Sequence, residues 1–130
     1  MKTEYIEIPR DNWGIVIVFD YDDMDFYDLA AVMESFSLPD YKIKEALDVL
    51  SEPNTGMTIS RFDIRMSVMF ISYATSEKQW YNTIFHECKH VADAILDYYD
   101  VRYDGEEAAY LTGFIAEQII DLFGEPCFNN

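Results

Sequence analysis

The chain has 130 residues, of which 50% are hydrophobic and 16% aromatic. This length and composition exclude a disordered chain and predict one compact domain over residues 1–130. The formal net charge is −16, from 25 acidic and 9 basic side chains. Binding to nucleic acid or to an anionic membrane is therefore not expected, because both need clustered Lys and Arg, and a basic partner fits better.

Neither a membrane span nor a secretion signal is predicted. No apolar run approaches the roughly 20 residues that a transmembrane helix needs, and the residues from Met1 to Glu4 begin no hydrophobic signal core. We therefore expect a cytoplasmic protein. The two cysteines, Cys88 and Cys127, are too few for a disulfide scaffold and are predicted to be reduced.

A hairpin is the first predicted element. Residues 3–8 alternate loosely between apolar and polar, and after turn residues at 9–12 the β-branched run 15–19 predicts a central strand. We expect the two segments to pair.

Five aspartates follow, at positions 20, 22, 23, 25 and 28. They do not fit a calcium-binding EF-hand loop, in which Asp25 would have to be Gly and Ala31 would have to be Glu. We interpret them as acids at the start of a helix that runs from about Phe26 to Phe36.

A second helix and two strands are predicted next. The helix starts at about Pro39 and ends after Leu50, in a turn at 53–56. A short strand is expected at 57–60. From Phe62 to Phe70 apolar and polar residues alternate, which predicts a half-buried strand.

Two longer helices complete the chain. Ser76 and Gln79 form a capping-box pattern that starts a helix ending near Tyr98 or Tyr99. After a loop at 100–105, the last helix is expected at 106–123. Its predicted apolar positions include Tyr110, Phe114, Ile115, Ile119 and Leu122. The predicted fold class is α+β, with a small mixed or antiparallel sheet of about three to four strands packed against helices.

The first long helix carries a metal-binding motif. Residues 86–90 are His-Glu-Cys-Lys-His, and His86 and His90 are the only histidines of the chain. Side chains at i and i+4 are neighbours on a helix, so both imidazoles can bind one zinc ion. Glu87 lies about 100° around the helix from His86, where a general base can reach a metal-bound water. The alternative is a solvated helix face that happens to carry two histidines.

Two acids continue the histidine face, Asp93 and Asp97. Such carboxylates can orient an imidazole by accepting its second N–H, although acids at these positions more often face solvent.

A catalytic zinc needs a third protein ligand and an open position for water. With no third histidine, and with neither cysteine in a suitable pattern, this ligand is expected to be a carboxylate. The metzincin continuation does not fit, because Asp93 occupies its Gly position and Leu96 its final His position.

The chain resembles the gluzincin class of zinc metallopeptidases, in which the helical H-E-x-x-H motif is joined by a Glu from the next helix. Residues 106–111, Glu-Glu-Ala-Ala-Tyr-Leu, look like the ligand-bearing helix start of ImmA/IrrE-like peptidases and related short phage proteins. On that register Glu106 matches the third ligand and Tyr110 the aromatic that follows it, and Glu107 is the neighbouring alternative. The resemblance covers about residues 57–123 and implies a zincin-like fold, in the host cytoplasm if the protein is phage-encoded.

The resemblance implies peptide-bond hydrolysis, with zinc activating a water and Glu87 acting as the base. No histidine remains to stabilise the oxyanion, so Tyr110, Tyr81, Tyr103 or the zinc alone is expected to do so. The segment at about 64–73 is the predicted sheet edge for the peptide or protein substrate.

A non-catalytic function is the competing hypothesis. The chain would then be an acidic binding or inhibitor protein, with a structural or vestigial metal site. The sequence carries no indication of an oligomeric state.

Overall fold

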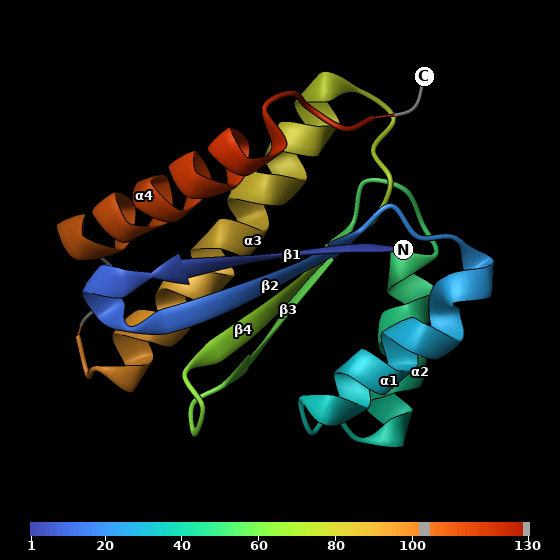
Figure 1. Cartoon of the computed structure of the whole chain (residues 1–130), viewed down its shortest axis with the longest axis horizontal. Coiled ribbons are helices and arrows are strands. Elements are labelled where there is room, and N and C mark those ends of the chain that lie inside the picture. Colours follow the sequence, from blue (N-terminus) through green and yellow to red (C-terminus); the bar gives the residue numbers. More distant parts are fainter. Residues whose placement is uncertain (102–104, 129–130) are drawn as a thin grey trace.

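The computed structural model describes residues 1–101 and 105–128. Within them, one four-stranded mixed sheet lies between two helix pairs, with α1 and α2 on one face and α3 and α4 on the other (Figure 1). The predicted α+β class is confirmed. The elements, in chain order, are β1 (Lys2–Ile8), the 3-10 turn η1 (Pro9–Asp11), β2 (Trp13–Phe19), the 3-10 turn η2 (Asp23–Asp25), α1 (Phe26–Ser35), α2 (Asp40–Leu50), β3 (Gly56–Arg61), β4 (Met66–Ile71), α3 (Glu77–Tyr98) and α4 (Glu106–Phe123).

The strand order is β1-β2-β4-β3. The predicted hairpin of β1 and β2 is confirmed, and β3 pairs with β4 in the same antiparallel way. The two hairpins join through β2 and β4, which run parallel. The edges of the sheet are therefore β1 and β3.

The structure corrects two predictions about the fourth strand. Phe62 and Arg65 belong to the turn between β3 and β4, and Arg65 has a left-handed backbone with φ of 50°. β4 is buried along five of its six residues, because helices cover both faces of the sheet. It lies between β2 and β3, so the expectation that the segment at about 64–73 offers a free edge is wrong.

Each face of the sheet has its own core. Ile15, Ile17 and Met69 pack with α3 and α4, whereas Val18 and Val68 pack with α1 and α2. Successive side chains of a strand point to opposite faces, so a strand covered on both sides is apolar throughout. This explains the continuous apolar run in β2.

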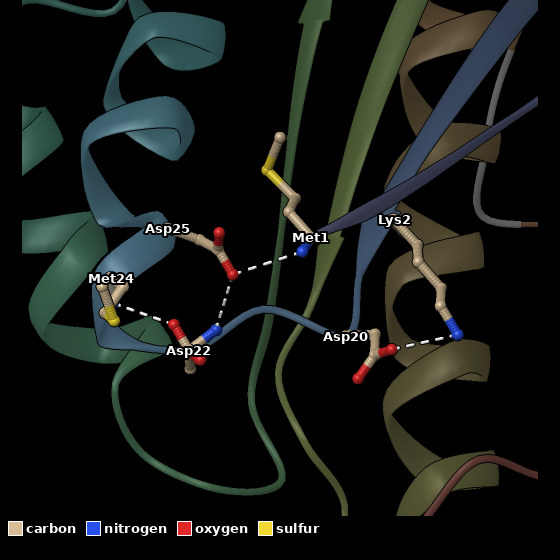
Figure 2. Close-up of polar contacts among 6 residues, drawn as sticks. All are labelled: Met1, Lys2, Asp20, Asp22, Met24 and Asp25. Carbon is tan, nitrogen blue, oxygen red and sulfur yellow. Dashed lines mark hydrogen bonds and ion pairs between the residues drawn. The ribbon is translucent and has the colours of Figure 1, made fainter.

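Two of the aspartates after β2 cap the 3-10 turn η2, whereas α1 itself, predicted to start with these acids, begins at Phe26 without a side-chain cap. The carboxylate of Asp22 accepts the backbone N–H of Met24, and the carboxylate of Asp25 accepts that of Asp22 (Figure 2). The amino terminus of Met1 also donates to Asp25 at 3.2 Å, which connects the start of β1 to η2.

Caps also determine where the other helices start. The hydroxyl of Ser76 accepts the backbone N–H of Gln79 at 3.2 Å, and α3 begins at Glu77 as predicted. Pro39 is the N-cap residue of α2. No helix within the described residues is long and apolar enough to cross a membrane.

The prediction for the buried face of the last helix is only partly right. Ile115 and Ile119 are buried as predicted, together with Leu111, whereas Tyr110, Phe114 and Leu122 are 68%, 39% and 38% exposed. Adjacent positions differ by about 100° around a helix, so the residues just before the buried ones turn away from the core. The aromatic character of Tyr110 and Phe114 was a misleading indication of burial.

Candidate metal centre

The histidine pair lies on the outer flank of α3. This helix packs over the β3 edge of the sheet, and α4 lies beside it over β1. The predicted apolar stripe of α3 is buried, including Ile84, Cys88 and Ile95. His86 and His90 remain exposed on the other side of the helix.

The two imidazoles are positioned to share an ion. Nε2 of His86 and Nε2 of His90 are 3.2 Å apart. Two nitrogens bound to one tetrahedral zinc at about 2.0–2.1 Å would be separated by about 3.3 Å. An N–H···N hydrogen bond between neutral imidazoles accounts for the same distance when no metal is bound. The two imidazoles therefore lie side by side, as their i, i+4 spacing predicts, and their nitrogens could hold a metal ion.

Glu87 is the third member of this cluster. Its side chain is only 2% exposed, and Oε2 lies 3.8 Å from Nε2 of His86. The possible ligand atoms of His86, Glu87 and His90 all lie within 4.8 Å of one another. A buried carboxylate therefore stands beside two exposed imidazoles, which suits either metal binding or general-base chemistry.

Thr58 of β3 holds the buried carboxylate. Its hydroxyl donates to Oε1 of Glu87 at 2.7 Å, which leaves Oε2 on the side of His86. Burying a carboxylate is costly unless it is hydrogen-bonded, so this contact offsets part of the cost of burying Glu87. The role of Thr58 is not predictable from the sequence, since nothing in a short strand indicates which of its residues will contact a helix two elements later.

Gly56 gives the same carboxylate its space. A Cβ at Gly56 would lie 2.8 Å from Cγ of Glu87 and 3.0 Å from Oε2. The added Cβ would also lie 3.0 Å from Cγ2 of Thr83, which precedes Glu87 by one turn on α3. The buried hydroxyl of Thr83 has no hydrogen-bond partner among the described residues. Gly56 was predicted only as a turn residue, so its role in the site is also new.

The predicted third ligand is not part of the cluster. Glu106 is exposed at the start of α4, on the flank of α3 away from β3, and is absent from the group of ligand atoms around the histidines. α3 also continues for eight residues beyond His90, roughly 12 Å of helix, before the chain turns back. The alternative ligand, Glu107, pairs with the guanidinium of Arg10 at 3.1 Å.

Other residues named from the sequence have partners elsewhere or lie outside the described part. Asp93 accepts a hydrogen bond from Lys89, so its carboxylate is paired with the ammonium of that residue. Tyr81 stacks on Phe85 with 5.9 Å between ring centroids. Tyr103 lies outside the described residues.

Comparison of the chain with known proteins found no matching family model, no matching curated protein and no matching solved structure.

Proposed function

We propose that the chain is a zinc-dependent peptide hydrolase whose ion is held by His86 and His90. The observation that carries the proposal is the 3.2 Å separation of their Nε2 atoms on an exposed helix face. Imidazole nitrogens are preferred zinc ligands, and an open face leaves room for water and substrate. The resemblance to gluzincins supports the same assignment.

The role of Glu87 follows from its two oxygens. A zinc ion bound at the histidines would supply Lewis-acid chemistry, lowering the pKa of a water and polarising the scissile carbonyl. Glu87 would accept the proton of that water at Oε2, while Thr58 holds Oε1 and keeps the carboxylate oriented. The same carboxyl group would then return the proton to the leaving amine.

Two carboxylates compete for the third ligand position. Glu87 is the nearest, but its Oε2 lies 3.8 Å from Nε2 of His86, longer than the separation of about 3.3 Å expected for two ligands of one tetrahedral zinc. Ligation by Glu87 would also remove the base. We therefore assign Glu87 to proton transfer and retain Glu106 as the proposed ligand, on the resemblance alone.

The peptide is proposed to bind along β3. This strand pairs only with β4 among the described residues, so its outer edge is open to an added strand. Thr58 lies in the middle of β3 and contacts Glu87, which brings this edge next to the candidate base. The net charge of −16 favours a basic peptide.

Replacing the base tests the proposal. Glu87→Gln keeps the size of the side chain, so we expect it to retain zinc while hydrolysis of a Lys- and Arg-rich peptide library falls at least about a hundredfold. Cleavage is read by mass spectrometry, with Glu106→Gln as a companion that should lose zinc. Undiminished cleavage by Glu87→Gln would overturn the assignment.

The non-catalytic alternative is favoured by one observation, the position of Glu106 outside the cluster. In that case the zinc would serve only a structural role and the acidic surface would bind a basic partner. Zinc bound by the wild type without cleavage of any library member would support this second function.

A further inference from the structure

The carboxyl ends of β2 and β4 form a second candidate site. These neighbouring strands run parallel, yet the chain leaves β2 toward α1 on one face and leaves β4 toward α3 on the other (Figure 1). In open α/β sheets such a reversal opens a crevice beyond the strand ends, where ligands commonly bind.

A cavity of about 300 Å³ lies at this reversal. Its walls include five aromatic residues: Phe19 from the end of β2, Trp80 from α3, Phe123 from the end of α4, and Tyr73 and Phe128. Phe123 meets Phe19 at 4.7 Å and Trp80 at 5.5 Å between centroids, both edge to face. The volume is at the lower end of the range for small-molecule pockets, and such pockets are mainly apolar with a few polar groups.

The polar group of this cavity is an ion pair. The carboxylate of Asp20, directly after β2, forms an ion pair with the ammonium of Lys2 at 3.1 Å (Figure 2), and both side chains are more than half exposed. Asp20 has a left-handed backbone, with φ of 53°, at the bend that ends the strand. An exposed ion pair of this kind contributes little to stability, so a ligand can replace Lys2 as the partner of Asp20 at a small free-energy cost.

The surroundings favour a cation. A hollow of about 630 Å³ adjoins the cavity through Asp20 and Tyr73, and its lining holds Asp22 and Asp23 but no basic residue. The whole chain carries −16. Lys2 is the only basic residue in the lining of either space.

We propose that this cavity binds a small aromatic amine. The ring of the ligand packs among Phe19, Trp80 and Phe123, and its ammonium pairs with Asp20. Aromatic faces attract cations in addition to burying apolar area, so both parts of the ligand are recognised. This site is separate from the histidines, because Trp80 precedes His86 by six residues, roughly 9 Å along α3.

Three probes with one ring and different charges test the proposal: phenethylamine, 2-phenylethanol and phenylacetate. Each is titrated into the full chain and followed by NMR. The NMR signal of the indole N–H of Trp80 reports on the cavity. The internal control is the indole N–H of Trp13, which lies at the amino end of β2 and donates a hydrogen bond to Ser67 of β4. We expect phenethylamine to shift the indole N–H signal of Trp80 but not that of Trp13. It should also bind about threefold to tenfold more tightly than 2-phenylethanol.

Two variants separate charge from folding. Asp20→Asn should remove the preference for the amine, and Asn also tolerates the left-handed backbone at this position. Lys2→Gln should strengthen amine binding, since it frees Asp20. Equal binding of all three probes, tighter binding of phenylacetate, or shifts of Trp13 as large as those of Trp80 would overturn the proposal.

Discussion

Glu87 is a buried carboxylate whose single described side-chain donor is the hydroxyl of Thr58. Thr58→Val keeps the shape of the side chain and removes that donor, so it should lower the free energy of unfolding by about 1–3 kcal/mol. Thr58→Ser keeps the hydroxyl and loses one methyl group, about 0.8 kcal/mol. Urea unfolding measures both, and a larger loss in Thr58→Ser than in Thr58→Val would show that the hydrogen bond is unimportant.

Gly→Ala substitutions at Gly56 and Gly113 form a matched pair of tests at the residue scale. Gly56→Ala places a Cβ at 2.8 Å from Cγ of Glu87, so it should destabilise the fold by about 1–3 kcal/mol. Gly113 is exposed within α4, with no atom within 4 Å of an added Cβ, so Gly113→Ala should stabilise by about 0.5–1 kcal/mol. Thermal unfolding measures both variants, and a Gly56→Ala protein as stable as the wild type would contradict the packing described around Glu87.

At the scale of elements, the segment η2 is connected to β1 through Asp25. The backbone N–H of Asp22 and the amino terminus of Met1 donate hydrogen bonds to the carboxylate of Asp25. These hydrogen bonds hold the pKa of Asp25 below the ordinary value of 3.8. A lowered pKa means stability that is present above the unfolded pKa and lost as the pH falls through the folded pKa.

Asp25→Asn tests that linkage. The wild type should be the more stable protein at about pH 7, and the difference should shrink as the pH falls through the lowered pKa of Asp25. Urea midpoints measured as a function of pH test this, with Asp28→Asn in the first turn of α1 as the control. A difference that does not change with pH would show that the Asp25 charge does not contribute.

The helices and the first hairpin were predictable because their signals are local. Ser76 caps α3 through an N–H three residues away, and the apolar run 15–19 indicates a strand without reference to the rest of the chain. The spacing of His86 and His90 likewise determines their approach on one helix.

The features that were missed depend on distant parts of the chain. Whether residues 62–65 extend a strand or form a turn depends on pairing between β3 and β4, and alternation alone cannot decide it. The contact of Thr58 with Glu87 joins residues 29 apart in the sequence. Glu106 was assigned from a sequence register, but its position relative to the histidines depends on the length of α3 and on which flank α4 packs.

At the scale of the whole molecule, the two candidate sites lie at different positions along α3, on the same side of the sheet. The histidines lie beside the β3 edge, whereas the aromatic cavity lies beyond the carboxyl ends of β2 and β4. α3 contributes residues to both sites: His86 and His90 to the first and Trp80 to the second.

The most direct test is the zinc content of protein purified without added metal. Wild type is compared with His86→Ala, His90→Ala and the control Asn82→Ala, which changes an exposed residue one turn before His86. We predict about one zinc per chain in the wild type and the control, and its loss from both histidine variants. Zinc absent from the wild type even after reconstitution, or retained by both histidine variants, would contradict a metal centre at this helix.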